Sequence, residues 1–139
     1  MTETPRVVGV DYGARRVGVA VTDPLRLFPR PLGTYAPGEA LRVLTALPDV
    51  GVFVVGWPVR DDGSEGAAVD RIRPFLGRLR KARPDAEVVV QDERDSSRRA
   101  MEGLVEAGVP RGKRRDKAQL DAAAACVILQ DWLDEHEGR

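Results

Sequence analysis

The sequence contains very few of the residues on which thiol and imidazole chemistry depend. Cys126 and His136 are the only cysteine and the only histidine in 139 residues. A single cysteine excludes an internal disulfide and a cysteine cluster for metal within one chain. A single histidine argues against a histidine-dependent triad and against an ordinary zinc site. Any catalytic chemistry must therefore rest on carboxylates, hydroxyls and basic groups.

The sequence also lacks long apolar runs and has few aromatic residues. No eighteen apolar residues occur together, and the start MTETPRVVGV has no basic stretch followed by an apolar block. We therefore expect a cytoplasmic protein with no membrane contact. Apolar residues make up 42% of the chain and charged residues 32%, which is typical of a folded protein. We expect one domain over 1–139, flexible at about 1–4 and 136–139, with an aliphatic core.

The formal net charge is zero, but the charge is unevenly distributed. The segment PRGKRRDK, residues 110–117, contains five basic residues and one acid. Such a local cluster attracts anions even when the whole chain is neutral. It is a candidate contact for nucleic-acid phosphates, and a solvated basic loop is the alternative.

The order of the apolar segments predicts an α/β fold. Residues 6–11 and 15–23 have the pattern of a β-hairpin, and 51–58 is a continuous apolar run typical of a central strand covered on both faces. Further strands are predicted near 32–35 and over 86–93, and helices over 39–47, 65–83, 96–108 and 116–136. Pro74 should kink or divide the second helix. A hairpin followed by alternating strands and helices indicates a mixed sheet with helices on both faces.

Three carboxylates are predicted to meet at one edge of this sheet. Asp11 ends the first strand and Glu93 ends the strand over 86–93, and ligands gather where parallel strands end. Asp121 lies, by helical spacing, on the face of the last helix that packs on the sheet, where a buried acid requires a cationic partner. Each acid also has a purely structural interpretation: a turn former, a solvated acid, and a helix-start acid or a salt bridge to Lys117.

Carboxylates without histidine or thiolate ligands favour hard cations. We therefore expect Mg²⁺ or Mn²⁺ at this edge. Two such ions about 4 Å apart, bridged by a carboxylate such as Asp11, clamp a phosphodiester and activate a water. Such metal-dependent chemistry on a phosphodiester needs neither histidine nor cysteine.

Four motifs in this order resemble the YqgF/RuvX family of RNase H-like nucleases. They are GVDYGARRVGVAVTD, VVGWPVRDDGSEG, QDERDSS and DKAQLDAAAACVILQDWLD, and together they span nearly the whole chain. The resemblance implies an RNase H-like fold with a five-stranded mixed sheet, and divalent-metal-dependent cleavage of structured nucleic acid in the cytoplasm. It places the family's acidic site on Asp11, Glu93 and Asp121, and basic positions suited to phosphate contact on Arg94 and Lys117.

The resemblance leaves the substrate and the full ligand set open. The family is associated with 5′-end processing of precursor 16S rRNA and with resolution of Holliday junctions, and the chain is expected to act as a monomer or homodimer. Where the family commonly has Leu-Thr-Thr after Asp-Glu-Arg, this chain has Asp95, Ser96 and Ser97. Candidates for a fourth carboxylate ligand are Asp23, Asp62, Asp92 and Asp95.

Substrate contacts are predicted beside the acids. The basic groups expected to attract backbone phosphates are Lys117, Arg94, Arg98, Lys113, Arg114 and Arg115, with Arg99 beside them. Trp57 either stacks an unpaired base or packs under a loop. One rival class is a non-catalytic nucleic-acid-binding module. The other is a fragment of an actin-like ATPase, because Asp-x-Gly on a strand turn also begins the phosphate-binding hairpin of those enzymes.

Overall fold

The computed structural model describes residues 5–58, 66–92, 99–100, 102–103, 108 and 117–137, and the side chains of all of these except 117–119. In chain order the elements are β1 (Arg6–Tyr12), β2 (Val17–Thr22), β3 (Pro29–Tyr35), α1 (Pro37–Ala46), β4 (Val50–Trp57), α2 (Ala67–Ala82), β5 (Glu87–Asp92) and α5 (Lys117–His136). Residues 99–100 and 102–103 are also helical, within the predicted helix over 96–108. In the part of the chain that is described, no helix combines the length and apolarity needed to cross a membrane.

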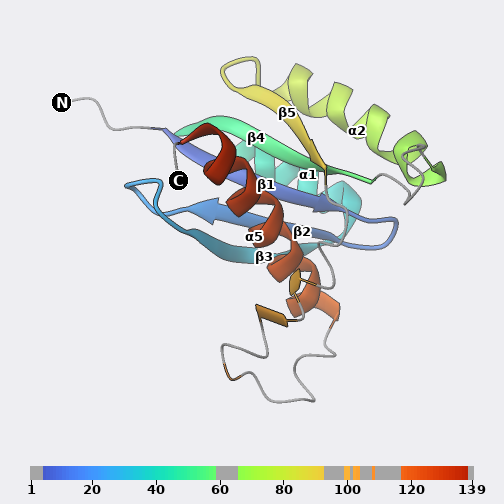
Figure 1. Cartoon of the computed structure of the whole chain (residues 1–139). Helices are drawn as coiled ribbons and strands as arrows, with labels where there is room; N and C mark the ends of the chain where they lie inside the picture. Colours follow the sequence, from blue (N-terminus) through green and yellow to red (C-terminus); the bar gives the residue numbers. More distant parts are fainter. Residues whose placement is uncertain are drawn as a thin grey trace.

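The five strands form one mixed sheet in the order β3-β2-β1-β4-β5. β1 and β2 are antiparallel, as are β2 and β3, whereas β1 is parallel to β4 and β4 to β5. The predicted α/β class and mixed five-stranded sheet are therefore confirmed. Because β1, β4 and β5 run in the same direction, they all end at one edge of the sheet, at Tyr12, Trp57 and Asp92 (Figure 1). We refer to this edge as the carboxyl edge.

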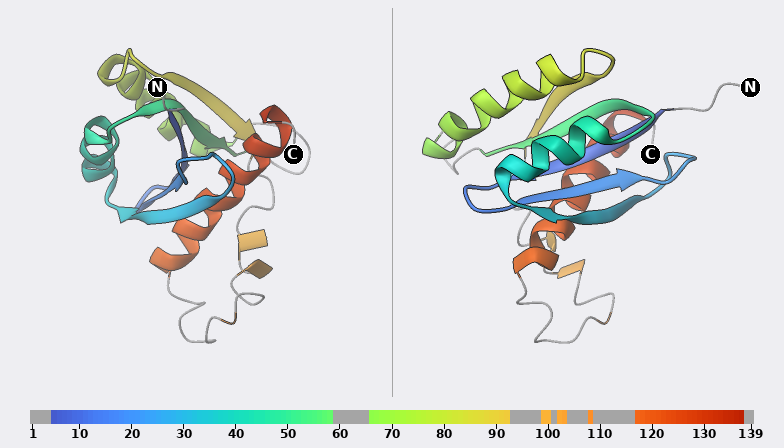
Figure 2. Two further views of the ribbon diagram at one scale, coloured as in Figure 1. Left: turned by 90° about the vertical axis from the view of Figure 1, so that its left-hand side faces the viewer. Right: turned by 180° about the vertical axis from the view of Figure 1, so that it is seen from behind.

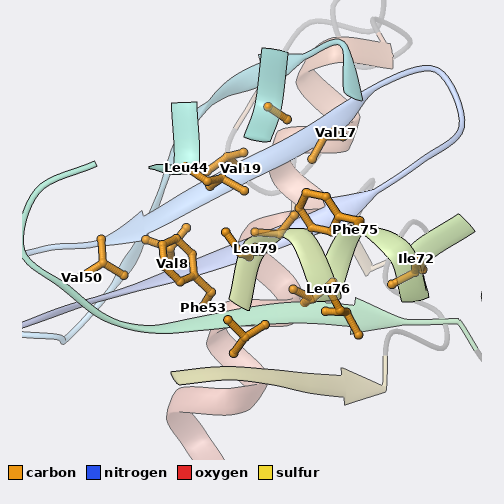
Figure 3. Packing of buried hydrophobic residues seen from close by; sticks show 14 of the residues in the cluster. Val8, Val17, Val19, Leu44, Val50, Phe53, Ile72, Phe75, Leu76 and Leu79 are labelled. Carbon is orange, nitrogen blue, oxygen red and sulfur yellow. The ribbon is translucent and has the colours of Figure 1, made fainter. Parts of the chain in front are cut away.

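Helices cover both faces of the sheet, as the apolar pattern of β4 predicts. Figure 2 shows α1 and α2 on one side and α5 on the other. Val8 and Val10 of β1 belong to the core under α1 and α2 with Phe53 and Leu79 (Figure 3), whereas Val7 belongs to the core under α5. The buried members of the α5 core are Val7, Ala20, Val54, Ala125, Ile128, Leu129, Trp132 and Leu133. Alternate residues of β1 thus face opposite helices, which fixes the side of the sheet on which each acid lies.

Pro74 does not divide the second helix. It lies inside α2, which is a single element from Ala67 to Ala82. The buried face of α2 comprises Val69, Ile72, Phe75, Leu76 and Leu79. These apolar contacts lie on both sides of Pro74, so packing on the sheet holds the two halves in one helix although proline removes one backbone donor.

Candidate functional site

Asp11 lies at the carboxyl edge on the face that α5 covers. It is the last residue but one of β1 and pairs across the strands with Gly18 of β2. Two residues earlier, Gly9 lies against α5, and Val7 belongs to the α5 core. Because side chains alternate along a strand, Asp11 faces α5 as well. Its side chain is half-buried there.

Two glycines allow the backbone of α5 to lie directly on the sheet. A Cβ atom at Gly9 would be 2.7 Å from the Ala125 carbonyl oxygen and 2.8 Å from the Leu129 Cβ. A Cβ atom at Gly18 would overlap the carbonyl group of Asp121 and lie 2.9 Å from the backbone nitrogen of the next residue. The small residues of α5 contribute to the same close approach, since Ala125 is fully buried. The sequence prediction of close helix docking is thus supported.

This docking brings Asp121 to the same end of the sheet as Asp11. From the Gly9 contact to Asp11 the strand advances two residues, or about 6.6 Å. From Ala125 back to Asp121 the helix advances four residues, or about 6 Å. The two acids therefore reach the same level, and Gly18, the cross-strand partner of Asp11, contacts the Asp121 backbone. Two of the three predicted acids thus lie at one end of one face.

Arg16 supplies the cationic partner that the position of Asp121 requires. The Arg16 Nε donates to Asp121 Oδ2 at 3.0 Å, and the two side chains are 38% and 27% exposed. Arg16 lies in the turn between β1 and β2, where the Gly13 backbone N–H donates to the Arg16 carbonyl at 2.9 Å. Sequence analysis predicted a cationic partner and named Lys117 as one possibility, but it did not identify Arg16. The available signal was the Arg-Arg pair at positions 15 and 16, in the turn that begins after Asp11.

The other predicted site residues lie outside the described structure. These are Glu93, Arg94, Arg98, Lys113, Arg114 and Arg115, together with Asp62 and Asp95 among the proposed fourth acids. Lys117 is the first residue of α5, and its side chain is also outside the description. Glu93 is the residue that follows the last residue of β5 in the sequence. Within the described residues, no group of three acids, histidines or cysteines is arranged to hold a metal ion.

Asp23, one of the four proposed additional ligands, lies at the wrong end of the sheet. It follows β2, which runs antiparallel to β1, so it lies at the edge opposite to Asp11. Its carboxylate accepts backbone N–H groups of Phe28 and Leu27, both at 2.7 Å, and of Leu25 at 3.3 Å. These hydrogen bonds, that of Phe28 foremost, lower the pKa of Asp23 from its usual value of 3.8. Asp23 therefore shapes the turn between β2 and β3.

Asp92, another of the proposed additional ligands, is at the carboxyl edge but on the other face. It ends β5 and pairs with Trp57 of β4. The preceding residue, Gln91, donates to Glu135 of α5 at 3.1 Å and so faces α5. Alternation along the strand places Asp92 on the side of α2, across the sheet from Asp11.

Two residues considered for substrate contact make intramolecular contacts in the structure. Trp57 packs against the core under α1 and α2, and the guanidinium carbon of Arg73 lies 5.3 Å from its ring centroid. The packing alternative for Trp57 was contact under a loop, and the structure instead shows its ring packed on this core. Arg99 forms a two-pronged ion pair with Asp131 of α5, at 2.7 and 2.8 Å. This ion pair attaches Arg99 to α5.

The cysteine and the histidine both lie farther along α5 than Asp121. Cys126 is mostly buried, and burial raises the pKa of its thiol to about 11, so it stays a neutral thiol at physiological pH. His136 ends α5, fifteen residues or about 22 Å of helix beyond Asp121. Its ring stacks on Trp132 with centroids 4.6 Å apart. His136 is therefore remote from the acids at the carboxyl edge, and Cys126 is a mostly buried neutral thiol.

Known proteins resemble this chain over nearly its whole length. A family model described as "RuvX: Holliday junction resolvase" matches residues 5–135. A protein of Salinibacter ruber named "Putative pre-16S rRNA nuclease" is 49% identical over 137 residues, covering 96% of each chain. A protein of Chlorobaculum tepidum with the same name is 43% identical over 134 residues, covering 94% of each chain.

Among solved structures, T. thermophilus RuvC in complex with a Holliday junction substrate has a similar fold. The TM-score is 0.50 at 15% identity, and the match covers 94% of this chain and 95% of that chain. The fold is thus RNase H-like, and together with the sequence matches it defines a hydrolytic nuclease. The chain belongs to the RuvX family. The resemblance drawn from the four sequence motifs is confirmed.

Proposed function

We propose that this chain is a divalent-metal-dependent endonuclease that cleaves structured nucleic acid in the cytoplasm, in 5′-end processing of precursor 16S rRNA. The observation that carries this proposal is the meeting of Asp11 and Asp121 at one end of the α5-covered face. The names of the relatives support the choice of substrate. A non-catalytic binding module is disfavoured because carboxylates gathered at one edge repel phosphates unless a metal ion is bound.

The chemistry of the described donors fits Mg²⁺ or Mn²⁺. Asp11 and Asp121 offer hard oxygen ligands. The positive charge of the Arg16 guanidinium lies beside the Asp121 carboxylate. Asp11, Asp121 and, by the family motif, Glu93 would hold the ion. When bound, the metal would polarise a phosphodiester and activate a water for attack.

The remaining tasks fall to the chain itself. Asp11 is fixed by the pairing of β1 with both β2 and β4, and Asp121 by the docking of α5 on Gly18. Both carboxylates are therefore positioned before substrate arrives, which is what metal-dependent catalysis requires. The basic groups assigned to the substrate backbone are Lys117, Arg94, Arg98, Lys113, Arg114 and Arg115. Their contacts with phosphate should weaken steeply as salt rises.

Resolution of Holliday junctions is the alternative function. The description of the matching family favours it, because it names this activity. Paired nicks in a four-way junction require two active sites related by symmetry, and hence a homodimer. Processing of an RNA end requires only a monomer. The oligomeric state on each substrate therefore helps to separate the two functions.

A cleavage assay with two substrates tests the proposal. Wild-type protein is offered a fragment of precursor 16S rRNA spanning the 5′ end, and separately a four-way DNA junction, in Mn²⁺, Mg²⁺ or EDTA. We expect cleavage of the RNA in either metal and none in EDTA, with 5′-phosphate and 3′-hydroxyl products. Symmetric nicks in the junction without cleavage of the RNA would establish the alternative. Cleavage that persists in EDTA would contradict both.

Asp11→Asn and Asp49→Asn provide the matched pair of variants. Asp11→Asn removes one ligand charge and should abolish cleavage while leaving the fold intact. Asp49→Asn makes the same chemical change at an exposed position before β4, at the opposite edge of the sheet. The backbone φ at Asp49 is +59°, a conformation that asparagine also tolerates. Equal activity of the two variants would exclude Asp11 from the site.

A further inference from the structure

The ion pair between Arg16 and Asp121 leaves part of both groups unused. Within the described part of the chain, Nε is the Arg16 side-chain atom that has a hydrogen-bond partner, and Oδ2 is the Asp121 atom that receives it. A guanidinium has five N–H donors, so the two Nη groups of Arg16 retain their capacity for an anion. Both side chains are partly exposed to solvent. The pair is therefore one that another ligand can exchange.

The turn between β1 and β2 fixes the backbone of Arg16 near Asp11 and Asp121, independently of the ion pair that its side chain makes. The Gly13 N–H to Arg16 carbonyl hydrogen bond closes the turn between β1 and β2, and a Cβ atom at Gly13 would be 2.8 Å from that carbonyl oxygen. The chain enters β2 at Val17, and the next residue, Gly18, lies under Asp121. Arg16 is thus anchored at the carboxyl edge, where a phosphate must approach Asp11 and Asp121.

We propose that Arg16 is a phosphate-binding residue of the substrate site, held by Asp121 in the metal-free protein and released to nucleic acid when Asp121 ligates a divalent ion. This inference rests on the proposed function, because it takes Asp121 as a metal ligand. The same guanidinium then has two anionic partners in succession, a carboxylate and a phosphate, and both suit its planar set of donors.

Exchange of this kind has two opposite consequences for binding. Without Arg16, Asp121 has no cation to give up before it ligates metal, so affinity for metal should rise. Without Arg16, the metal-loaded protein has one phosphate contact fewer, so affinity for nucleic acid should fall. A merely structural ion pair predicts neither result, because its loss would destabilise the fold without strengthening metal binding.

Arg15 provides a matched control. It is the neighbouring residue in the same turn, carries the same charge and is exposed, and it forms no side-chain hydrogen bond or ion pair with any described residue. Arg15→Gln and Arg16→Gln therefore change the net charge equally at nearly the same place. Any difference between them reports the contact of Arg16 with Asp121 rather than the general electrostatic field.

The first arm of the test measures Mn²⁺ binding to the full chain by electron paramagnetic resonance, without nucleic acid. Arg16→Gln should bind Mn²⁺ about two- to fivefold more tightly than wild type, the factor that a partly exposed ion pair is worth. Arg15→Gln should bind like wild type. Unchanged or weaker Mn²⁺ binding by Arg16→Gln, in protein shown to be folded by circular dichroism, would overturn the proposal.

The second arm measures binding of a labelled precursor 16S rRNA fragment and of a four-way DNA junction in Ca²⁺, which also prefers oxygen ligands. Arg16→Gln should bind the substrate more weakly than Arg15→Gln, with a logarithmic salt dependence smaller by about 1. Arg16→Lys should lie between Arg16→Gln and wild type. Equal affinity and equal salt dependence of Arg16→Gln and wild type would overturn the proposal.

Asp121→Asn separates this proposal from the proposed function. If Asp121→Asn binds Mn²⁺ as wild type does, Asp121 is no ligand and the proposed metal site itself is wrong. If Asp121→Asn loses Mn²⁺ while Arg16→Gln leaves both affinities unchanged, the site stands and the exchange by Arg16 is refuted. Both results are read from binding and do not depend on cleavage.

Discussion

The contact between Gly18 and α5 makes Gly18→Ala the most demanding substitution for the fold around the site. The added methyl group would overlap the Asp121 carbonyl group and approach the next backbone nitrogen to 2.9 Å. These neighbours are backbone atoms of a helix, so no side-chain rotation relieves the overlap. Overpacking of a well-packed core costs roughly 1–3 kcal/mol. We expect a loss of stability at the upper end of that range, since α5 itself must shift.

Gly77→Ala is the control for this substitution. Gly77 lies inside α2, and a Cβ atom there would meet nothing within 4 Å. Alanine in a helix interior is more favourable than glycine by about 0.5–1 kcal/mol. The two substitutions add the same methyl group, yet they should change the free energy of unfolding in opposite directions.

Urea unfolding followed by circular dichroism measures both changes. Gly18→Ala should lower the unfolding midpoint and Gly77→Ala should raise it, with similar slopes. Folded Gly18→Ala should also bind Mn²⁺ more weakly, because displacement of α5 carries Asp121 away from Asp11. A Gly18→Ala protein within about 0.5 kcal/mol of wild type, the usual range for neutral surface changes, would refute the proposed close docking of α5.

Three further predictions concern residues other than the proposed metal ligands. Arg83 donates at 2.9 and 2.7 Å to the carbonyl oxygens of Leu44 and Leu47 at the end of α1, so Arg83→Met should cost about 1–3 kcal/mol in urea unfolding. The thiol of Cys126, with its pKa raised to about 11, should resist alkylation at pH 8 in the native protein and react only after unfolding. The lowered pKa of Asp23 means that its charge stabilises the fold above the usual pKa of 3.8, and that this contribution is lost as the pH falls through the lower folded value. Asp23→Asn should therefore be less stable than wild type at pH 7, and an acid titration should show the difference shrinking as the pH falls below 3.8 and through the lower pKa of the folded state.

The sheet could be predicted from local patterns because its strands have different sequence signals: a hairpin pattern for β1 and β2, and a continuous apolar run for β4. The continuous apolar run of β4 predicted a strand covered on both faces, and its neighbours β1 and β5 are both parallel to it. Pro74 was predicted to kink or divide α2, and the structure excludes the division. The local cost of proline is evident in the sequence, whereas the buried face that holds α2 together depends on the rest of the core.

The candidate site was predicted unevenly for a similar reason. The positions of Asp11 and Asp121 follow from strand ends and helical spacing, so sequence reasoning found both. The identity of the cation at Asp121 depends on a contact across 105 residues, and Arg16 was therefore missed. The direction of β2 shows that Asp23 lies at the opposite edge from Asp11, and the alternation along β5 shows that Asp92 lies on the opposite face. Both conclusions require knowledge of how the strands pair, which the sequence alone does not provide.

Metal binding by three single variants tests the proposed site most directly. Mn²⁺ affinity is measured by electron paramagnetic resonance for Asp11→Asn, Asp121→Asn and the control Asp49→Asn, all without nucleic acid. The proposed site predicts that the first two lose most of their affinity for Mn²⁺ and that Asp49→Asn binds it like wild type. Wild-type affinity in both Asp11→Asn and Asp121→Asn would contradict a metal site at the carboxyl edge.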